Sequence, residues 1–122
     1  MKNFRDLEVW HKAHQLTLES YKATNGFPKK ELFGLTSHIR RAAVSIAANI
    51  AEGCGKRGNG EFQRFLGIAA GSASELEYHF LLAHELNLIA NLHYEQLNNG
   101  VVTVKRMLAA LLRKVNADRF AG

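Results

Sequence analysis

The stretch GLTSHIRRAAVSIAANIAEG, residues 34–53, decides the fold, because it predicts a helix with almost no face suited to water. One stripe of the helical wheel is apolar throughout, and we expect it to enter the core. This stripe consists of Leu35, Ile39, Ala43, Ile46 and Ile50. A second face consists of the small apolar residues Val44, Ala47, Ala48 and Ala51. Helices that are apolar nearly all round are normally buried, so we expect sister helices on one side and another subunit on the other.

A polar stripe separates these two apolar faces and consists of Arg41, Ser45, Asn49 and Glu52. On a later helix, Ser72, Glu75 and His79 occupy adjoining wheel positions beside the core seam. Buried charges are costly unless they are paired and hydrogen-bonded. We therefore predict a structural network between the two helices, with Arg41 and Glu75 as its ion pair. A functional pocket is the alternative interpretation of the same set.

Hydrophobic spacing predicts three further helices, over residues 4–24, 59–88 and 91–116. The first offers two apolar rows, Leu7, Trp10, His14, Thr17 and Tyr21 beside Val9, Ala13, Leu16 and Ala23. The third has a heptad seam of Phe62, Leu66, Ala69, Ala73, Leu76, Phe80 and Ala83. The fourth repeats the spacing with Leu97, Val101, Val104, Leu108, Leu111 and Val115. A turn or strand near Gly100 is the alternative, but the unbroken seam favours a helix.

The connections between these helices are short and carry turn residues. Asn3 with Asp6 resembles a capping box for the first helix, and Asn25-Gly26 is expected to end it through a left-handed glycine. Asn59 is a candidate cap for the third helix. Four helices with short connections imply an all-α, antiparallel up-down-up-down four-helix bundle. We expect residues 1–122 to form this single domain.

The cysteine content and the apolar runs of the sequence indicate the cellular compartment. The single cysteine, Cys54, excludes an intramolecular disulfide. No uncharged run exceeds ten residues, whereas a membrane span needs about 18, and the first residues lack the apolar block of a signal peptide. We therefore expect a soluble cytoplasmic protein with no membrane association.

Charge is distributed unevenly along the chain, whose net charge is +5. Residues 1–64 carry eleven Lys and Arg against six acids, residues 65–104 carry none against four, and residues 105–122 carry five against one. Basic helices beside an acidic one could simply pair within the bundle. The alternative is a basic surface that binds nucleic-acid phosphates, because release of condensed counterions drives binding to Lys and Arg clusters.

The nucleic-acid candidates are basic residues of the second connection, the fourth helix and one position on the second helix. They are Arg40, Lys56, Arg57, Arg64, Lys105, Arg106, Arg113 and Lys114. Arg40 points toward the small-residue face, where it could line a rim or a channel. Arg106 and Arg113 are seven residues apart and share a helix face. Such contacts position a phosphate backbone and read no bases.

No arrangement of residues supports catalysis, a metal or a cofactor. Gly53, Gly55 and Gly58 match a dinucleotide fingerprint, but that motif follows a strand, and here a helix precedes it. Carboxylate-bridged metal bundles need two Glu-x-x-His pairs, and only Glu8 with His11 is present. Cys54 has no histidine at helical spacing. We expect no enzyme activity, no cofactor and no metal.

Three motifs resemble those of a known family. FRDLEVW in the first helix, GLTSHIRRAAVSIAANIAEG in the second and EFQRFLGIAAGSASELEYHFLLA in the third look like the bacterial four-helix-bundle family named after 23S ribosomal RNA intervening sequences. The fourth helix matches only loosely. The resemblance implies a barrel-shaped homopentamer. It extends to the accessory variability determinant of diversity-generating retroelements, a pentamer that binds nucleic acid and a reverse transcriptase.

Taken together, these features predict a non-enzymatic oligomeric helical module. It would bind RNA or DNA, or a nucleoprotein partner such as a reverse transcriptase, through its basic surface. The alternative is a structural adaptor that recognises another protein and uses its positive charge only for solubility.

Overall fold

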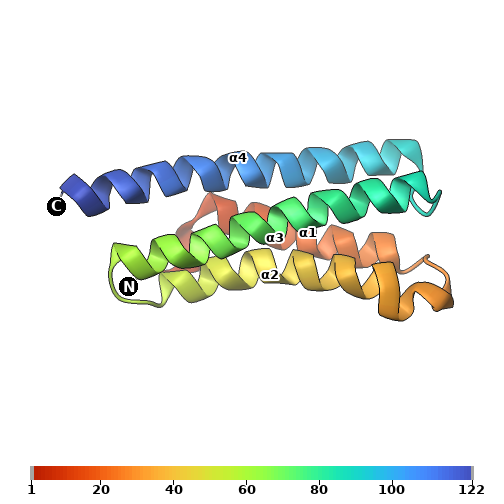
Figure 1. Cartoon of the computed structure of the whole chain (residues 1–122), viewed down its shortest axis with the longest axis horizontal. Coiled ribbons are helices and arrows are strands. Elements are labelled where there is room, and N and C mark those ends of the chain that lie inside the picture. The colour runs from red at the N-terminus through yellow and green to blue at the C-terminus, as the bar shows by residue number, and fades with distance from the viewer. Residues whose placement is uncertain (1, 122) are drawn as a thin grey trace.

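The computed structural model describes residues 2–121, and all regular structure in this part is helical. Four long helices form the fold, namely α1 (Glu8–Thr24), α2 (Ser37–Cys54), α3 (Asn59–Glu85) and α4 (Asn91–Ala121). Consecutive helices run in opposite directions, so the two ends of the chain lie at the same end of the molecule (Figure 1). Because α1 and α3 each contact both α2 and α4, the chain is a four-helix bundle, as predicted. No described helix has the length and apolarity needed to cross a membrane.

Most of the core comes from the apolar rows that the sequence predicts for the last three helices. All five residues of the stripe predicted for the second helix and all seven of the α3 seam are buried. The α4 seam is buried too, apart from Leu111, which is half-buried. Full burial of one Leu, Ile or Phe side chain contributes about 1.5–3 kcal/mol, so these rows supply most of the free energy that holds the helices together.

Helix α1 uses only one of its two apolar rows for the core. Val9, Ala13 and Leu16 are buried, whereas Trp10 is half-buried and His14 is exposed. The row that contains Trp10 and His14 thus lies at the margin of the bundle, beside the small residues of α2.

The structure corrects the start of the first helix. Residues Phe4–Asp6 form a separate short 3₁₀ turn, and Leu7 is extended, with φ −94° and ψ 123°. The Oδ1 atom of Asn3 accepts a hydrogen bond of 3.0 Å from the backbone N–H of Arg5. Asn3 is therefore a cap, as predicted, but it caps this turn and not α1.

The second helix also starts later in the structure than the sequence predicts. A 3₁₀ turn (Lys29–Glu31) and a π turn (Leu32–Thr36) precede α2, which begins at Ser37 instead of residue 34. Gly34 has non-helical backbone angles inside the π turn, and the Glu31 carboxylate accepts from the backbone N–H of Leu35. The predicted helix start is wrong because Gly34 breaks the helix that its neighbours favour.

The end of α1 is predicted correctly, but its mechanism is not. The helix ends at Thr24, yet Asn25 keeps a right-handed conformation and Gly26 is not left-handed. The left-handed residues among those described are Gly58, with φ 80°, and Asn87, with φ 63°. A left-handed residue therefore follows α3 and not α1.

The last two helices differ from the predicted ranges only at their ends. Helix α3 ends at Glu85, three residues before the prediction, because the left-handed Asn87 turns the chain. Helix α4 passes through Gly100 without a break and reaches Ala121, five residues beyond the predicted end. The continuous apolar seam across Gly100 therefore outweighs the turn signal of the neighbouring asparagines.

Three glycines of the bundle give a direct test of this packing. A methyl group added at Gly67 or Gly71 would meet nothing within 4 Å, so Gly67→Ala and Gly71→Ala should each stabilise the isolated chain by about 0.8–1 kcal/mol through helix propensity. A methyl group at Gly53 would lie 2.9 Å from Cβ of Phe65 and 3.2 Å from Cδ1 of Phe62. Gly53→Ala should therefore destabilise the chain. Urea unfolding followed by circular dichroism measures all three, and stabilisation by Gly53→Ala would contradict the α2 to α3 packing.

Candidate functional site

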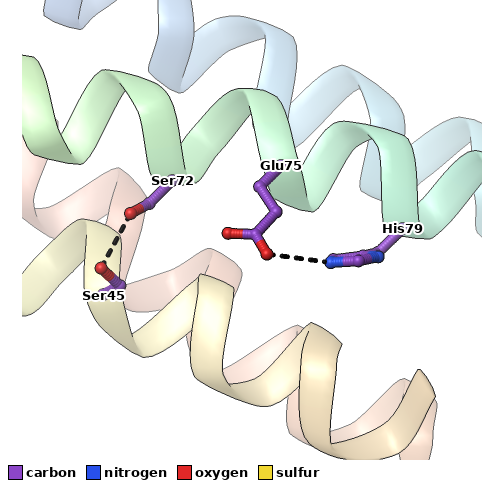
Figure 2. Close-up of polar contacts among 4 residues, drawn as sticks. All are labelled: Ser45, Ser72, Glu75 and His79. Carbon is purple, nitrogen blue, oxygen red and sulfur yellow. Dashed lines mark hydrogen bonds and ion pairs between the residues drawn. The ribbon is translucent and has the colours of Figure 1, made fainter. Parts of the chain in front are cut away.

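Polar side chains join α2 and α3 halfway along the bundle. The hydroxyl oxygens of Ser45 and Ser72 lie 2.8 Å apart (Figure 2). The Asn49 side-chain amide donates to the Ser45 carbonyl at 2.7 Å and to its hydroxyl at 3.0 Å. These three predicted members of the network are thus brought together as a half-buried hydrogen-bonded cluster between the two helices.

Glu75 and His79 form a second, separate pair on α3. Oε2 of Glu75 lies 3.3 Å from Nε2 of His79 (Figure 2). An ionised carboxylate can only accept, so Nε2 carries the proton in this pair. The His79 side chain is only 13% exposed, and its Nδ1 atom is buried without a hydrogen-bond partner among the described residues. Burial and the Glu75 contact together hold the ring in one orientation.

The predicted ion pair between Arg41 and Glu75 is not formed. Arg41 is exposed and makes no ion pair with any described residue, because Glu75 instead pairs with His79 four positions along its own helix. Glu52 is likewise exposed and unpaired within residues 2–121. The network of the prediction is therefore two clusters, with Arg41 and Glu52 outside both.

Arg41 and Glu75 instead line a groove between α2 and α3. This polar groove has a volume of about 360 Å³ and is lined by His38, Arg41, Ala42, Ser45 and Glu75. His38 also stacks on His79, with ring centroids 5.4 Å apart and planes 30° apart. The sequence prediction missed His38, although its spacing of three from Arg41 and seven from Ser45 continues the polar stripe toward the start of α2.

Two of the eight nucleic-acid candidates are engaged within the bundle. The Arg40 guanidinium donates to Oγ1 of Thr24 at 2.8 Å and to Oδ1 of Asn25 at 3.1 Å, and lies 4.6 Å from the centre of the Tyr21 ring. It therefore ties α2 to the end of α1. Lys105 is half-buried and forms a 2.7 Å ion pair with Glu77 of α3. The geometry gives both residues a role between helices.

The other candidates are exposed, and most of them lie at one end of the bundle. Two hydrogen bonds, from Gln63 to Asn116 at 3.1 Å and from Arg119 to Gln63 at 3.0 Å, place the last turns of α4 against the first turns of α3. The α2–α3 connection lies at the same end (Figure 1). We call this surface the basic end, and it is formed by Lys56, Arg57, Arg64, Arg113 and Lys114.

Two cations of the basic end rest on one aromatic ring. Lys56 and Arg64 lie over Phe65, 5.6 and 4.5 Å from the centre of its ring. Arg64 also pairs with Glu61 at 3.1 Å, and both side chains are about half exposed, at 58% and 49%. Exposed pairs of this kind contribute about 0–1 kcal/mol, so Arg64 can exchange Glu61 for another anion.

Most of the charge at the basic end is not compensated by acids of the chain. Arg57, Arg113 and Lys114 are exposed and form no ion pair with the described residues. The same is true of Arg106, which lies farther along α4. These four cations are therefore free to meet anions from outside the molecule.

A shallow apolar groove runs between α1 and α2. Its volume is about 280 Å³, and it is lined by Phe4, Trp10, His14, Thr17, Val44, Ala47, Ala48 and Ala51. Trp10 stacks on His14 with ring centroids 4.9 Å apart, while Val44 is 42% exposed. The small-residue face of α2 and the outer row of α1 thus form one continuous surface, which the single chain leaves uncovered.

Cys54 is buried at the end of α2. Burial raises the pKa of the Cys54 thiol, and nearby Lys2 opposes that shift only in part. A raised pKa leaves little thiolate, the nucleophilic form. Among residues 2–121 no group of three or more His, Cys, Asp or Glu side chains could hold a metal ion. Gly53 is part of α2, so the glycine-rich connection does follow a helix.

The fold and its surface define the class of the protein. It is an all-α protein that consists of an antiparallel four-helix bundle with a polar groove on one face and a basic end. Within this class, the chain belongs to the 23S rRNA-intervening sequence protein family, whose sequence model matches residues 5–110. This confirms the resemblance carried by the three sequence motifs. No curated protein matches the sequence.

A solved structure shares the fold. It is a protein with unknown function from the S23 ribosomal protein family of Bacteroides thetaiotaomicron, with 26% sequence identity and a TM-score of 0.77. The match covers 85% of this chain and 97% of that one. The bundle is therefore common to both proteins over nearly the whole length of the second.

The free energy of unfolding should distinguish an arginine that is bound within the bundle, such as Arg40, from an exposed arginine, such as Arg57. Arg40→Ala removes the hydrogen bonds to Thr24 and Asn25 and should lower the free energy of unfolding by about 1 kcal/mol. Arg57→Ala, the matched control, should change it by less than about 0.5 kcal/mol because Arg57 is an exposed surface residue without such contacts. Urea unfolding of both variants tests the assignment. Equal effects would show that Arg40 is not a structural residue.

Proposed function

We propose that this protein is a non-enzymatic oligomeric module that binds the phosphate backbone of nucleic acid through its basic end. The observation that carries the proposal is the gathering of exposed cations from the α2–α3 connection and α4 on one end of the bundle. Residues 52–64 and 113–119 together contribute six Lys and Arg against three acids. A surplus of this kind attracts phosphates and releases their condensed counterions.

The contacts at the basic end suit backbone binding. The charged groups of Lys56 and Arg64 lie over the Phe65 ring, which limits their motion, and both residues remain exposed. Arg113 and Arg106 extend the positive surface along α4. In an assembly of several chains, repeated weak contacts would act together and strengthen binding well beyond that of one copy.

Fluorescence anisotropy of labelled RNA and DNA at several salt concentrations tests this proposal. Binding should weaken steeply with salt, and the slope of log affinity against log salt should flatten by about one for each phosphate contact that a substitution removes. The informative variant replaces two cations of the basic end, Lys56 and Arg57, with Ala. The matched control replaces Lys29 and Lys30, exposed lysines of the α1–α2 connection at the opposite end of the bundle.

Two results would contradict the proposal. If the opposite-end control flattened the slope as much as the basic-end variant, binding would follow total charge and not this surface. If no nucleic acid bound even at low salt, the positive charge would serve solubility alone.

Oligomer formation is the second part of the proposal. The apolar groove between α1 and α2 exposes Val44 and Ala48 to solvent in the single chain. Exposed apolar surfaces of this kind commonly mark protein contacts. A second copy of the chain is the occupant that the two-faced pattern of α2 favours, and a closed ring such as a pentamer would bury this face in every subunit.

Ala48→Glu should dissociate the assembly, because it places a charge on the apolar groove. Ala109→Glu, on the exposed face of α4, is the matched control and should leave the mass unchanged. Light scattering coupled to gel filtration measures both. A wild-type chain that is folded and monomeric at working concentration would remove this part of the proposal.

A protein adaptor is the second candidate function, and one observation favours it. Phe33 is 90% exposed and Leu32 49% exposed in the α1–α2 connection. Leu86 and Leu92, around the α3–α4 connection at the same end, are also exposed (Figure 1). Exposed apolar side chains suit a protein partner better than a phosphate backbone, so weaker partner capture by Phe33→Ser would support the adaptor function.

A further inference from the structure

The polar groove between α2 and α3 is not used by the function proposed above. It lies beside the first half of α2, away from the basic end, and opposite charges face it from its two walls, Arg41 on α2 and Glu75 on α3. The chain does not neutralise these charges against each other. Arg41 keeps all its donors available, since it forms no hydrogen bond or ion pair with a described residue.

His38 provides a flat surface at the edge of this groove. One side of its ring stacks on His79 at 5.4 Å between centroids. His79 is itself held in place by burial and by its 3.3 Å contact with Glu75. His38 is exposed. An exposed planar ring that stacks on a second, fixed ring is the kind of platform on which unstacked bases lie.

The groove therefore presents a stacking ring, a side chain that only donates and a side chain that only accepts. Arg41 carries five N–H donors and no acceptor, while an ionised Glu75 carries acceptors alone. Each Glu75 oxygen has two lone pairs, so the contact with His79 leaves capacity for a ligand.

Guanine is the base that matches this pattern. Its O6 and N7 atoms are adjacent acceptors that arginine reads in a bidentate manner. Its N1–H and N2–H₂ groups are adjacent donors, which a carboxylate accepts as a pair. Uracil sets its one N–H between two carbonyl oxygens, which Glu75 would repel, and cytosine and adenine each place only a single donor group beside a bare ring nitrogen.

We propose that the polar groove binds one unpaired guanine base, which stacks on His38, accepts from Arg41 and donates to Glu75. The base would come from single-stranded nucleic acid held at the basic end, in which case the inference rests on the proposed function, or from a free guanine nucleotide. In either case the groove supplies the base discrimination that contacts to the phosphate backbone do not give.

Binding of matched oligonucleotides tests the proposal. Two labelled single-stranded RNAs of equal length, one with guanine at a few positions and one with adenine there, are titrated at the same salt concentration. We expect the guanine strand to bind about tenfold more tightly. Glu75→Gln should abolish that preference while leaving the salt slope unchanged, because the new amide presents an N–H₂ group to the guanine donors and the basic end is untouched. Glu85→Gln, on the exposed end of α3, is the matched control and should keep the preference.

Free nucleotides separate the two sources of the base. Guanosine 5′-monophosphate and cytidine 5′-monophosphate are titrated by calorimetry into the wild type and the Glu75→Gln variant. Selective binding of the guanine nucleotide by the wild type alone supports the groove even if no RNA binds, and the proposed function would then fail alone. Salt-dependent RNA binding with no guanine preference, and no selective nucleotide binding, would overturn the inference and leave the proposed function standing.

Discussion

The structure depends on the contact between the isoleucine row of α2 and its neighbours α1 and α3. Ile39, Ile46 and Ile50 are fully buried, and β-branched residues pack rigidly because their side chains have few rotamers. This contact fixes the rotation of α2 about its axis. Once that rotation is set, the polar stripe must face α3 and the alanine face must lie beside the outer row of α1. The polar groove and the apolar groove are therefore two consequences of a single packing arrangement.

The main features of the bundle could be predicted from the sequence because they follow from spacing alone. The row from Phe62 to Ala83 repeats with the helix period, so its spacing identifies the face that the structure buries. For helix α1 the spacing did not identify the buried face, because two rows of residues had the same spacing. The structure buries the row of Val9 and Ala13, while Trp10 stays half-buried at the margin of the core. The row that stays at the margin also carries the polar residues His14 and Thr17, whereas Val9, Ala13 and Leu16 are apolar, and spacing alone does not distinguish the two rows.

The candidate sites could be predicted less well, because side-chain partners depend on local competition. Arg41 and Glu75 line the same groove between α2 and α3, but His79 lies four residues from Glu75 on the same helix and pairs with it instead. Arg40 was expected at a rim or channel, yet the end of α1 offered it Thr24 and Asn25 as acceptors. For both arginines the helix face could be predicted from the sequence. The partner of each side chain could be identified only from the three-dimensional structure. The family match adds the fold and leaves the site residues to be tested.

The last turns of the long helix α4 differ from the rest of the bundle in how easily they can open. From Asn116 to Arg119 every side chain is exposed, and the hydrogen bonds to Gln63 join this segment to α3. Few buried apolar contacts and solvent-exposed hydrogen bonds are the features of segments that open locally at low free energy. The final turns of α4 can therefore fray and reform while the core remains intact. Amide hydrogens there would exchange far faster than those of α2. The positive surface that they border would therefore change its shape while the rest of the bundle stays rigid.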